Sequence, residues 1–441
     1  MLKSEFISDY VEFLSNNKTE RMCVNEAVRL ARENGFRTMD EIVGSKEWIG
    51  PGQKIYFTNK GKNFACAIIG TESNKSGVNI LGAHIDSPRL DVKTQPLYES
   101  EDIAYLDTQY YGGIKKYQWT TRPLTIQGVV FKMDGTCVDI SIGDKEGDPC
   151  FFISDLLPHL DKNLSERTGD KVIDGEKLDI VFGTTKLEGE ETDAVKKSIL
   201  EVLKTNFGIE EDDFTSAELE IVPSGKARYC GFDASMIGGY GQDDRVCAYT
   251  SLRAILDMKQ TPKRTAVCVL IDKEEVGSIC ATGTESRWFE DVLRTIMACE
   301  NEVVFGQRLA DSDMISSDVT AAVDPLYTDV CNVKQSSKLG NGMVISKYNG
   351  GRGKSYGADA NAEFVAKIRN ILTVAKVKYQ FDEMGKVDVG GGGTIASIIS
   401  RLNINVIDCG VPVLNMHSPM EITHTEDVWE TYLGYSAFLK H

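Results

Sequence analysis

The sequence predicts an α/β fold: a mixed, mostly parallel sheet flanked by helices, with a β-rich domain inserted between its two halves. Before residue 91 and after residue 229, compact apolar runs of strand length alternate with helical segments. This rhythm is typical of a mostly parallel sheet covered by helices. Between these positions the pattern changes to short β-like pieces separated by charged, turn-rich stretches, which indicates a separate β-rich insertion.

The length of the chain supports this division. At 441 residues the chain exceeds what a single hydrophobic core usually supports, so two domains are expected. We assign residues 1–90 and 230–441 to the α/β domain and residues 91–229 to the insertion. The net charge is −17, and such an acidic surface argues against nucleic acid or an anionic membrane as a partner.

The elements of the first part follow from periodicity. Residues 4–34 have the spacing of an amphipathic helix, and residues 54–69 read as a strand pair around Asn59–Lys60–Gly61. The apolar run 77–83 predicts a buried strand that ends at His84. A helical segment is therefore followed by three strands.

The later elements are read in the same way. Within the insertion, residues 191–206 are helical and the stretch ELEIVPS is strand-like. Beyond it, DRVCAYTSLRAILDM predicts a helix, and TAVCVLID (265–272) and NINVIDCGVPV predict buried strands. The carboxyl ends of such strands are where open parallel sheets bind ligands.

The cysteines and the N-terminus bear on location. The eleven cysteines are scattered, odd in number and without a C-x-x-C pair, which favours free thiols in a reducing compartment. The N-terminal stretch lacks the apolar run of a signal peptide, and no segment has the length of a membrane span. We therefore expect a cytoplasmic protein.

Candidate ligands stand where these strands end. The stretch GAHIDSPRL places His84 and Asp86 after the first buried strand. A lone His-x-Asp pair is more often a satisfied core histidine than a metal ligand. The interpretation changes because further acidic or imidazole groups occupy comparable positions elsewhere: Asp243, Asp244, Glu274, Glu275, Asp318 and His417.

This donor set indicates hydrolytic metal chemistry. Adjacent carboxylates are costly to gather unless a cation neutralises them. Imidazole with carboxylates suits two divalent ions, most of all Zn²⁺, with Co²⁺ or Mn²⁺ as alternatives. Two ions about 3.5–4 Å apart, bridged by a carboxylate, generate a hydroxide at neutral pH and polarise a carbonyl. The Glu274–Glu275 pair offers one ligand and one free general base.

The order and spacing of these motifs resemble the aspartyl aminopeptidase family of dinuclear zinc metallopeptidases. The resemblance covers essentially the whole chain: His-x-Asp, an inserted domain, Asp-Asp, Glu-Glu-Val-Gly-Ser, Ser-x-Asp and Met-His-Ser. It implies a zinc-peptidase-like fold and removal of N-terminal residues, acidic Asp or Glu among them, from peptides. It also implies homodimers formed through the insertion and assembled into a tetrahedral dodecamer.

The resemblance implies a role for each matching residue. One metal would be bound by His84 and Asp318, the second by Glu275 and His417, with Asp243 bridging both. Asp86 would orient His84, and Glu274 would be the general base. The bridging aspartate would be followed by a non-proline cis peptide. His159 would reach the active site of a neighbouring subunit and contact substrate.

Alternatives remain open at this point. Lys273 and Met420 depart from the family pattern near the substrate pocket, so a neutral-residue aminopeptidase or a deacylase is an alternative. A non-catalytic assembly protein on the same fold is a further one, although it would have no use for an unliganded Glu274. Cations that could bind an acidic substrate side chain are Arg89, Lys347, Arg352 and Lys354.

Overall fold

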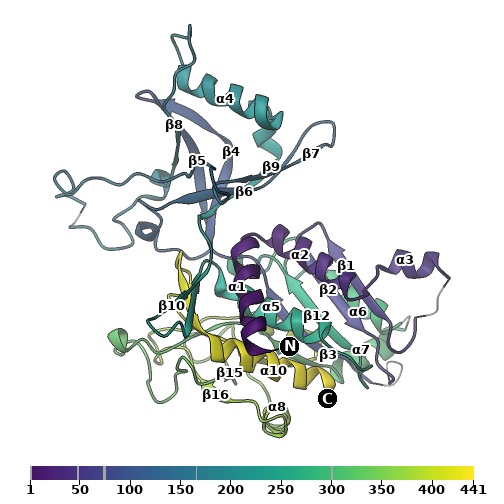
Figure 1. Cartoon of the computed structure of the whole chain (residues 1–441). Helices are drawn as coiled ribbons and strands as arrows, with labels where there is room; N and C mark the ends of the chain where they lie inside the picture. The colour runs from purple at the N-terminus through teal and green to yellow at the C-terminus, as the bar shows by residue number, and fades with distance from the viewer. Residues whose placement is uncertain (1, 47–48, 73–75, 165, 299–300) are drawn as a thin grey trace. The chain divides into compact units, whose positions relative to one another are not determined.

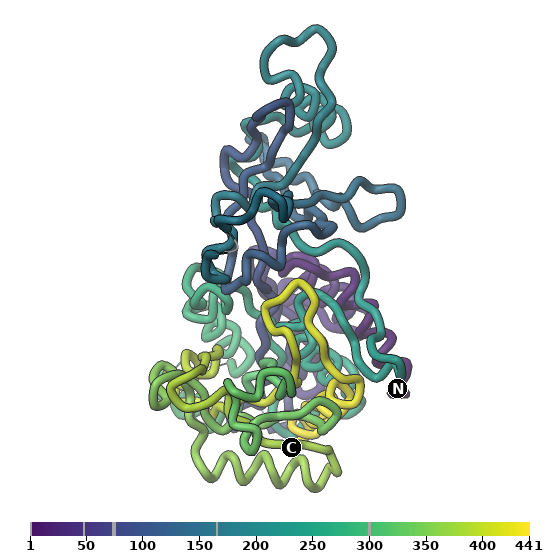
Figure 2. The backbone as a smooth tube through the Cα atoms, turned by 90° about the vertical axis from the view of Figure 1, so that its left-hand side faces the viewer, coloured from purple at the N-terminus to yellow at the C-terminus, as the bar shows by residue number. Residues whose placement is uncertain are grey.

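The computed structural model describes the chain except for residues 1, 47–48, 73–75, 165 and 299–300. Its contacts divide the chain into two compact units. The first comprises Met1–Asp86, Ala227–Met416 and Met420–His441, and the second Ser87–Lys226 with His417–Pro419. Both chain termini belong to the first unit, and Figure 2 marks them on the backbone trace.

The first unit is built on an eight-stranded mixed sheet in the described part of the chain. Its four central strands are mutually parallel. Antiparallel pairs join the flanking strands to them on both sides, and the two outermost strands on one side pair with each other in parallel. This confirms the predicted fold class. In spatial order the strands are β1 (Lys54–Asn59), β2 (Asn63–Ile68), β12 (Ala266–Ile271), β3 (Asn79–His84), β13 (Asp313–Ser316), β17 (Asn405–Gly410), β15 (Met343–Ser346) and β16 (Tyr379–Asp382).

Helices bury both faces of this sheet. Successive side chains of a strand point to opposite faces, so in β12 Cys268 and Leu270 join one core and Val267 and Val269 the other. The first core receives α1 (Lys3–Asn16), α2 (Glu20–Glu33), α5 (Gln242–Leu256), α8 (Ala362–Val374) and α10 (Thr425–Lys440). The second receives α3 (Met39–Gly44), α6 (Trp288–Ile296), α7 (Glu302–Ala310) and α9 (Ala396–Ile399). Figure 1 shows α1, α5 and α10 packed together.

The N-terminal segment differs from expectation in one respect. The helical segment predicted over residues 4–34 forms two helices, because the helix is interrupted between Asn16 and Glu20. The Thr19 hydroxyl accepts the backbone N–H of Met22 at 3.3 Å and so begins a second helix. A threonine in this N-cap position satisfies a backbone donor that the first turn leaves unpaired.

A smaller five-stranded sheet completes the first unit in the described residues. Its strands are β10 (Arg228–Cys230), β11 (Met236–Gly239), β19 (Glu421–His424), β18 (Pro412–Leu414) and β14 (Thr320–Ala321). Asp243 lies at the start of α5, just after the short link from β11, and the link between β18 and β19 carries His417.

The second unit contains a six-stranded antiparallel sheet and one long helix, α4 (Ala194–Phe207), in its described residues. In spatial order the strands are β7 (Cys137–Ile142), β6 (Leu124–Phe131), β9 (Ala217–Pro223), β4 (Arg89–Ser100), β5 (Ile103–Tyr111) and β8 (Ile180–Gly183). Exposed apolar side chains in this unit include Leu156, Leu157 and Leu160, on the loop that carries His159.

Candidate metal centre

His84 is the last residue of β3 and is only 2% exposed. Its Nδ1 lies 3.0 Å from the backbone carbonyl oxygen of Asp86. Because a carbonyl can only accept, Nδ1 carries a proton there. The other ring nitrogen, Nε2, faces the Asp243 carboxylate at 3.1 Å. This orientation, with one nitrogen held by the protein, is usual for a histidine that binds metal through the other.

Asp243 stands at the start of α5, where the backbone is not helical. The residues before it turn sharply, since Gly241 has a φ of +71° and an added Cβ would meet the Arg245 guanidinium at 2.2 Å. The Asp243–Asp244 peptide bond is cis, as the family resemblance implied. The backbone N–H of Asp243 donates to Oε2 of Glu421 at 3.0 Å. This bond fixes the backbone from which the Asp243 carboxylate extends.

Asp318 follows β13, beside His84. Its Oδ1 lies 4.0 Å from Nε2 of His84. The neighbouring strand β17 passes so close that a Cβ at Gly410 would stand 1.8 Å from the Asp318 carbonyl oxygen. Any side chain at position 410 would clash with the Asp318 backbone, so only glycine fits there.

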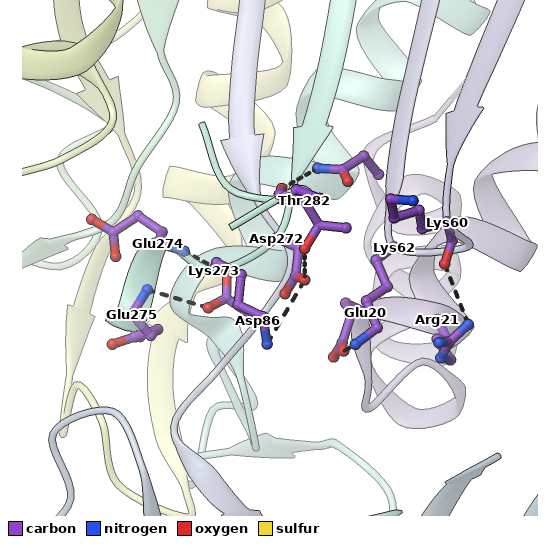
Figure 3. Close-up of polar contacts among 12 residues, drawn as sticks. Glu20, Arg21, Lys60, Lys62, Asp86, Asp272, Lys273, Glu274, Glu275 and Thr282 are labelled. Atoms are coloured by element: carbon purple, nitrogen blue, oxygen red, sulfur yellow. Dashed lines mark hydrogen bonds and ion pairs between the residues drawn. The ribbon is translucent and has the colours of Figure 1, made fainter. Parts of the chain in front are cut away.

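Glu274 and Glu275 begin a short 3₁₀ turn, η4 (Glu274–Val276), after β12. The Asp86 carboxylate accepts the backbone N–H of Glu274 at 3.1 Å and that of Glu275 at 3.2 Å, as Figure 3 shows. The carboxylate of Glu274 reaches to 4.0 Å from Nε2 of His84. Asp86 thus contacts both His84 and the glutamate pair, a second contact that the sequence did not predict.

Two sets of side chains offer ligand atoms that lie within 4.8 Å of one another. The first set is His84, Asp243 and Asp318, and the second is Asp243, Glu275 and His417. Asp243 belongs to both sets, and Glu274 to neither. Nδ1 of His417 lies 3.0 Å from the carbonyl oxygen of Gly113.

The electrostatics of the first set point to a cation. Burial raises the pKa of Asp318 well above its ordinary value, and Asp244, Glu274 and Asp243 raise it further against the opposing effect of His84. For His84, burial alone would lower the pKa, but hydrogen bonds to Asp243 and Asp86, with nearby Glu274 and Asp318, raise it well above its ordinary value. Repelling carboxylates that share one imidazole are the arrangement a divalent ion neutralises.

The residues therefore fit the metal that the motifs predicted. Imidazole nitrogen and carboxylate oxygen are zinc ligands. The tautomer of His84 leaves Nε2 toward Asp243, and the crowded acids need positive charge. All five predicted ligands fall within the two sets of ligand atoms.

A family model described as aminopeptidase I zinc metalloprotease (M18) matches residues 13–439. The chain belongs to the M18 family. It is therefore a zinc-dependent aminopeptidase, a hydrolase, and the predicted metallopeptidase resemblance is confirmed. The non-catalytic alternative is not supported by this membership.

Relatives of the M18 family match along nearly the whole chain. A probable M18 family aminopeptidase 1 of Clostridium acetobutylicum is 50% identical and is covered to 94%, with 98% of this chain aligned. A probable M18 family aminopeptidase 1 of Thermotoga maritima is 45% identical, covering 99% of this chain and 95% of the relative.

Solved structures give the same result. The M18 aminopeptidase of Thermotoga maritima has a TM-score of 0.95 at 44% identity, covering 99% of this chain and 96% of that one. Aminopeptidase I of Clostridium acetobutylicum has a TM-score of 0.92 at 51% identity, covering 98% and 94%. A yeast mApe1 dodecamer, 21% identical with a TM-score of 0.77 over 98% and 96%, shares the fold.

The remaining histidines lie outside the two ligand sets. His159 is exposed, on a loop of the second unit. His424 caps α10, where its Nδ1 accepts the backbone N–H of Glu426 at 3.1 Å. His441 is exposed at the C-terminal end.

Sequence reasoning did not identify the residues that fix the backbone around Asp243. Besides Glu421, Gln242 is fully buried and its Oε1 accepts the Tyr10 hydroxyl at 2.8 Å. The position of Glu421, four residues after His417 in the Met-His-Ser motif, was the one local signal that could have indicated it.

Metal binding should release protons. The raised pKa values of His84 and Asp318 mean that the metal-free centre keeps protons to higher pH than free side chains would, and ligands must lose them to bind zinc. Zinc titration by calorimetry in buffers of different ionisation enthalpy should therefore give buffer-dependent heats. Because both groups lose protons as pH rises through their raised pKa values, the proton release should fall with rising pH.

The control is His441→Ala, which should leave this proton release unchanged. Heats that are the same in every buffer would contradict the account of the centre.

Proposed function

We propose that the chain hydrolyses the N-terminal residue of peptides at a centre of two divalent ions. One ion would be held by His84, Asp243 and Asp318. The other would be held by Asp243, Glu275 and His417. The observation that carries this proposal is the pair of ligand sets that share Asp243, beside a glutamate that belongs to neither.

The chain's own residues would then have separate roles in the reaction. Bound divalent ions supply Lewis acidity, which lowers the pKa of a water and polarises the scissile carbonyl. Glu274, near His84 but outside both ligand sets, would accept the proton of the attacking water and deliver it to the leaving amine. Asp86 would hold the backbone of Glu274 and Glu275 in position beside His84.

Replacing the proposed base tests this division. Glu274→Gln keeps the size of the side chain but cannot accept a proton, so kcat should fall by about 10²- to 10⁴-fold, the usual contribution of general acid–base catalysis. The bound zinc, measured by elemental analysis, should stay at the wild-type level. Turnover is measured on a panel of chromogenic amino-acid substrates and N-acyl compounds.

The matched control is Glu363→Gln, an exposed glutamate on α8, which should leave kcat unchanged. A Glu274→Gln variant with full activity would refute the proposed base. Hydrolysis of the N-acyl compounds alone would favour the deacylase alternative.

The structure distinguishes the four cations considered for an acidic substrate side chain. Arg89 is 4% exposed and its Nε lies 2.8 Å from an Asp91 carboxylate oxygen. Lys347 and Lys354 both pair with Asp359, at 2.6 and 2.8 Å. Arg352 is exposed and lines a cavity of about 240 Å³ between two glycine-rich loops, residues 349–353 and 385–392.

The cavity with Arg352 is connected to the eight-stranded sheet through Asn349, one of its lining residues. Asn349 donates to the Asp408 carboxylate at 2.9 Å, within β17 next to β13. We infer that Arg352 binds the carboxylate of an N-terminal Asp or Glu, so that the acidic preference resides in this cavity. A neutral-residue aminopeptidase is the alternative.

Removing this cation should change specificity. Arg352→Ala should lower kcat/KM for an N-terminal glutamate about 10- to 100-fold, which is the loss of one hydrogen bond to a charged group. An N-terminal leucine substrate should be hydrolysed as by the wild type, and the exposed Lys259→Ala should change neither. Equal losses on both substrates, or none, would favour the neutral-residue alternative.

We also propose that the chain assembles with copies of itself through the second unit. The exposed Leu156, Leu157 and Leu160 beside His159 support this, because a cluster of exposed apolar side chains often marks an interface. His159 would then contact substrate in the site of a neighbouring copy. The dodecamer described for yeast mApe1 motivates dimers joined into a tetrahedral dodecamer here.

The proposed setting is the cytoplasm, where free thiols are stable. All described cysteines are unpaired by disulfides, among them the fully buried Cys66 and Cys268. No helix in the described residues is long and apolar enough to cross a bilayer. Peptides are the proposed partners, rather than nucleic acid or membranes, in keeping with the acidic charge.

A further inference from the structure

The loop after β12 is closed at its base by a side-chain hydrogen bond. Asp272 directly follows β12, and ten residues later the hydroxyl of Thr282 donates to Oδ2 of Asp272 at 2.6 Å, as Figure 3 shows. Both residues are buried, at 0% and 6% exposure. The segment between them carries Glu274 and Glu275, so this bond joins the two ends of the loop on which both glutamates stand.

The C-terminal end of this loop is also hydrogen-bonded to side chains of β1 and β2. The side-chain amide of Asn63 donates to the carbonyl oxygen of Thr282 at 2.6 Å. That of Asn59 donates to the carbonyl oxygen of Ala281 at 2.9 Å. Asn63 begins β2, which pairs with β12. Neighbouring strands of one sheet therefore hold both ends of the loop.

The backbone of this loop needs such support. Lys273, Ser278 and Cys280 have φ values of +74°, +60° and +84°, in the left-handed region that side-chain-bearing residues rarely adopt. Residues persist in such conformations where the surrounding structure holds them. Apart from the bond between Asp272 and Thr282, the Asp86 carboxylate holds the Glu274 and Glu275 amides.

We propose that Thr282 is a positioning residue: its hydroxyl, bonded to Asp272, fixes the loop that aims the Glu274 and Glu275 carboxylates. This inference rests on the proposed function, in which Glu274 moves the proton. General bases act only within hydrogen-bond reach of that proton, and a displacement of about 1 Å can cost about 10²-fold in rate. Thr282 itself touches no reacting atom.

Three variants separate the hydrogen bond from packing. Thr282→Val keeps the shape of the side chain and removes its donor, whereas Thr282→Ser keeps the donor and removes the methyl group. Thr284→Val is the matched control, because the Thr284 hydroxyl is buried on the same loop and has no hydrogen-bond partner in the described part of the chain.

The first measurement is hydrogen–deuterium exchange of the metal-free protein over peptides spanning residues 272–284. In Thr282→Val these amides should exchange about 10-fold faster or more, because the loop opens more often. In Thr282→Ser and Thr284→Val they should exchange like the wild type. Wild-type exchange in Thr282→Val would overturn the proposal.

The second measurement is steady-state kinetics of the zinc-loaded enzymes. Thr282→Val should lower kcat about 10- to 100-fold at unchanged KM and zinc content, while the other two variants keep wild-type kcat. Faster exchange with unchanged kcat would overturn the positioning role. If the wild type hydrolysed no peptide, the proposed function would fail, whereas the exchange experiment would still decide whether Thr282 holds the loop.

Discussion

The constraint on which the rest of this structure depends is the gathering of acidic side chains around one buried histidine. Nε2 of His84 has carboxylate oxygens of Asp243, Glu274 and Asp318 within 4.0 Å. Water is largely excluded there, so negative charges raise one another's pKa and would be protonated or neutralised. The M18 family membership identifies the neutralising agent as zinc. The surrounding backbone then serves to hold this otherwise unfavourable arrangement.

The topology explains how distant residues reach one place. The parallel strands β12, β3 and β13 end at the same edge of the sheet, and each is followed by one or more of the acids or ends in the histidine. The start of α5 brings Asp243 to this edge. Close backbone approach, as at Gly410, lets the strands lie near enough for their side chains to meet. A mixed α/β sheet therefore supplies the framework for a metal centre without any dedicated metal-binding motif of adjacent residues.

Much of this could be predicted because local patterns mark it. Apolar runs predict the strands over 77–83 and 265–272, and His84 and the Glu274–Glu275 pair stand where these strands end. The strand β13, which precedes Asp318, was not predicted. What could not be predicted depends on partners far apart along the chain. Asp243 is held by Glu421, 178 residues away, and no periodicity reveals that bond. The break before α2 depends on a single capping threonine inside a continuous helical pattern, and the exposure of His159 depends on a loop without regular structure.

An anomalous-difference map at the zinc edge, from crystals of the zinc-loaded protein, tests the central claim most directly. The account predicts two peaks, both in contact with the Asp243 carboxylate. One should also contact His84 and Asp318, the other Glu275 and His417, with Glu274 bound to neither. A map whose peaks avoid Asp243, or one in which Glu274 ligates the metal, would contradict it.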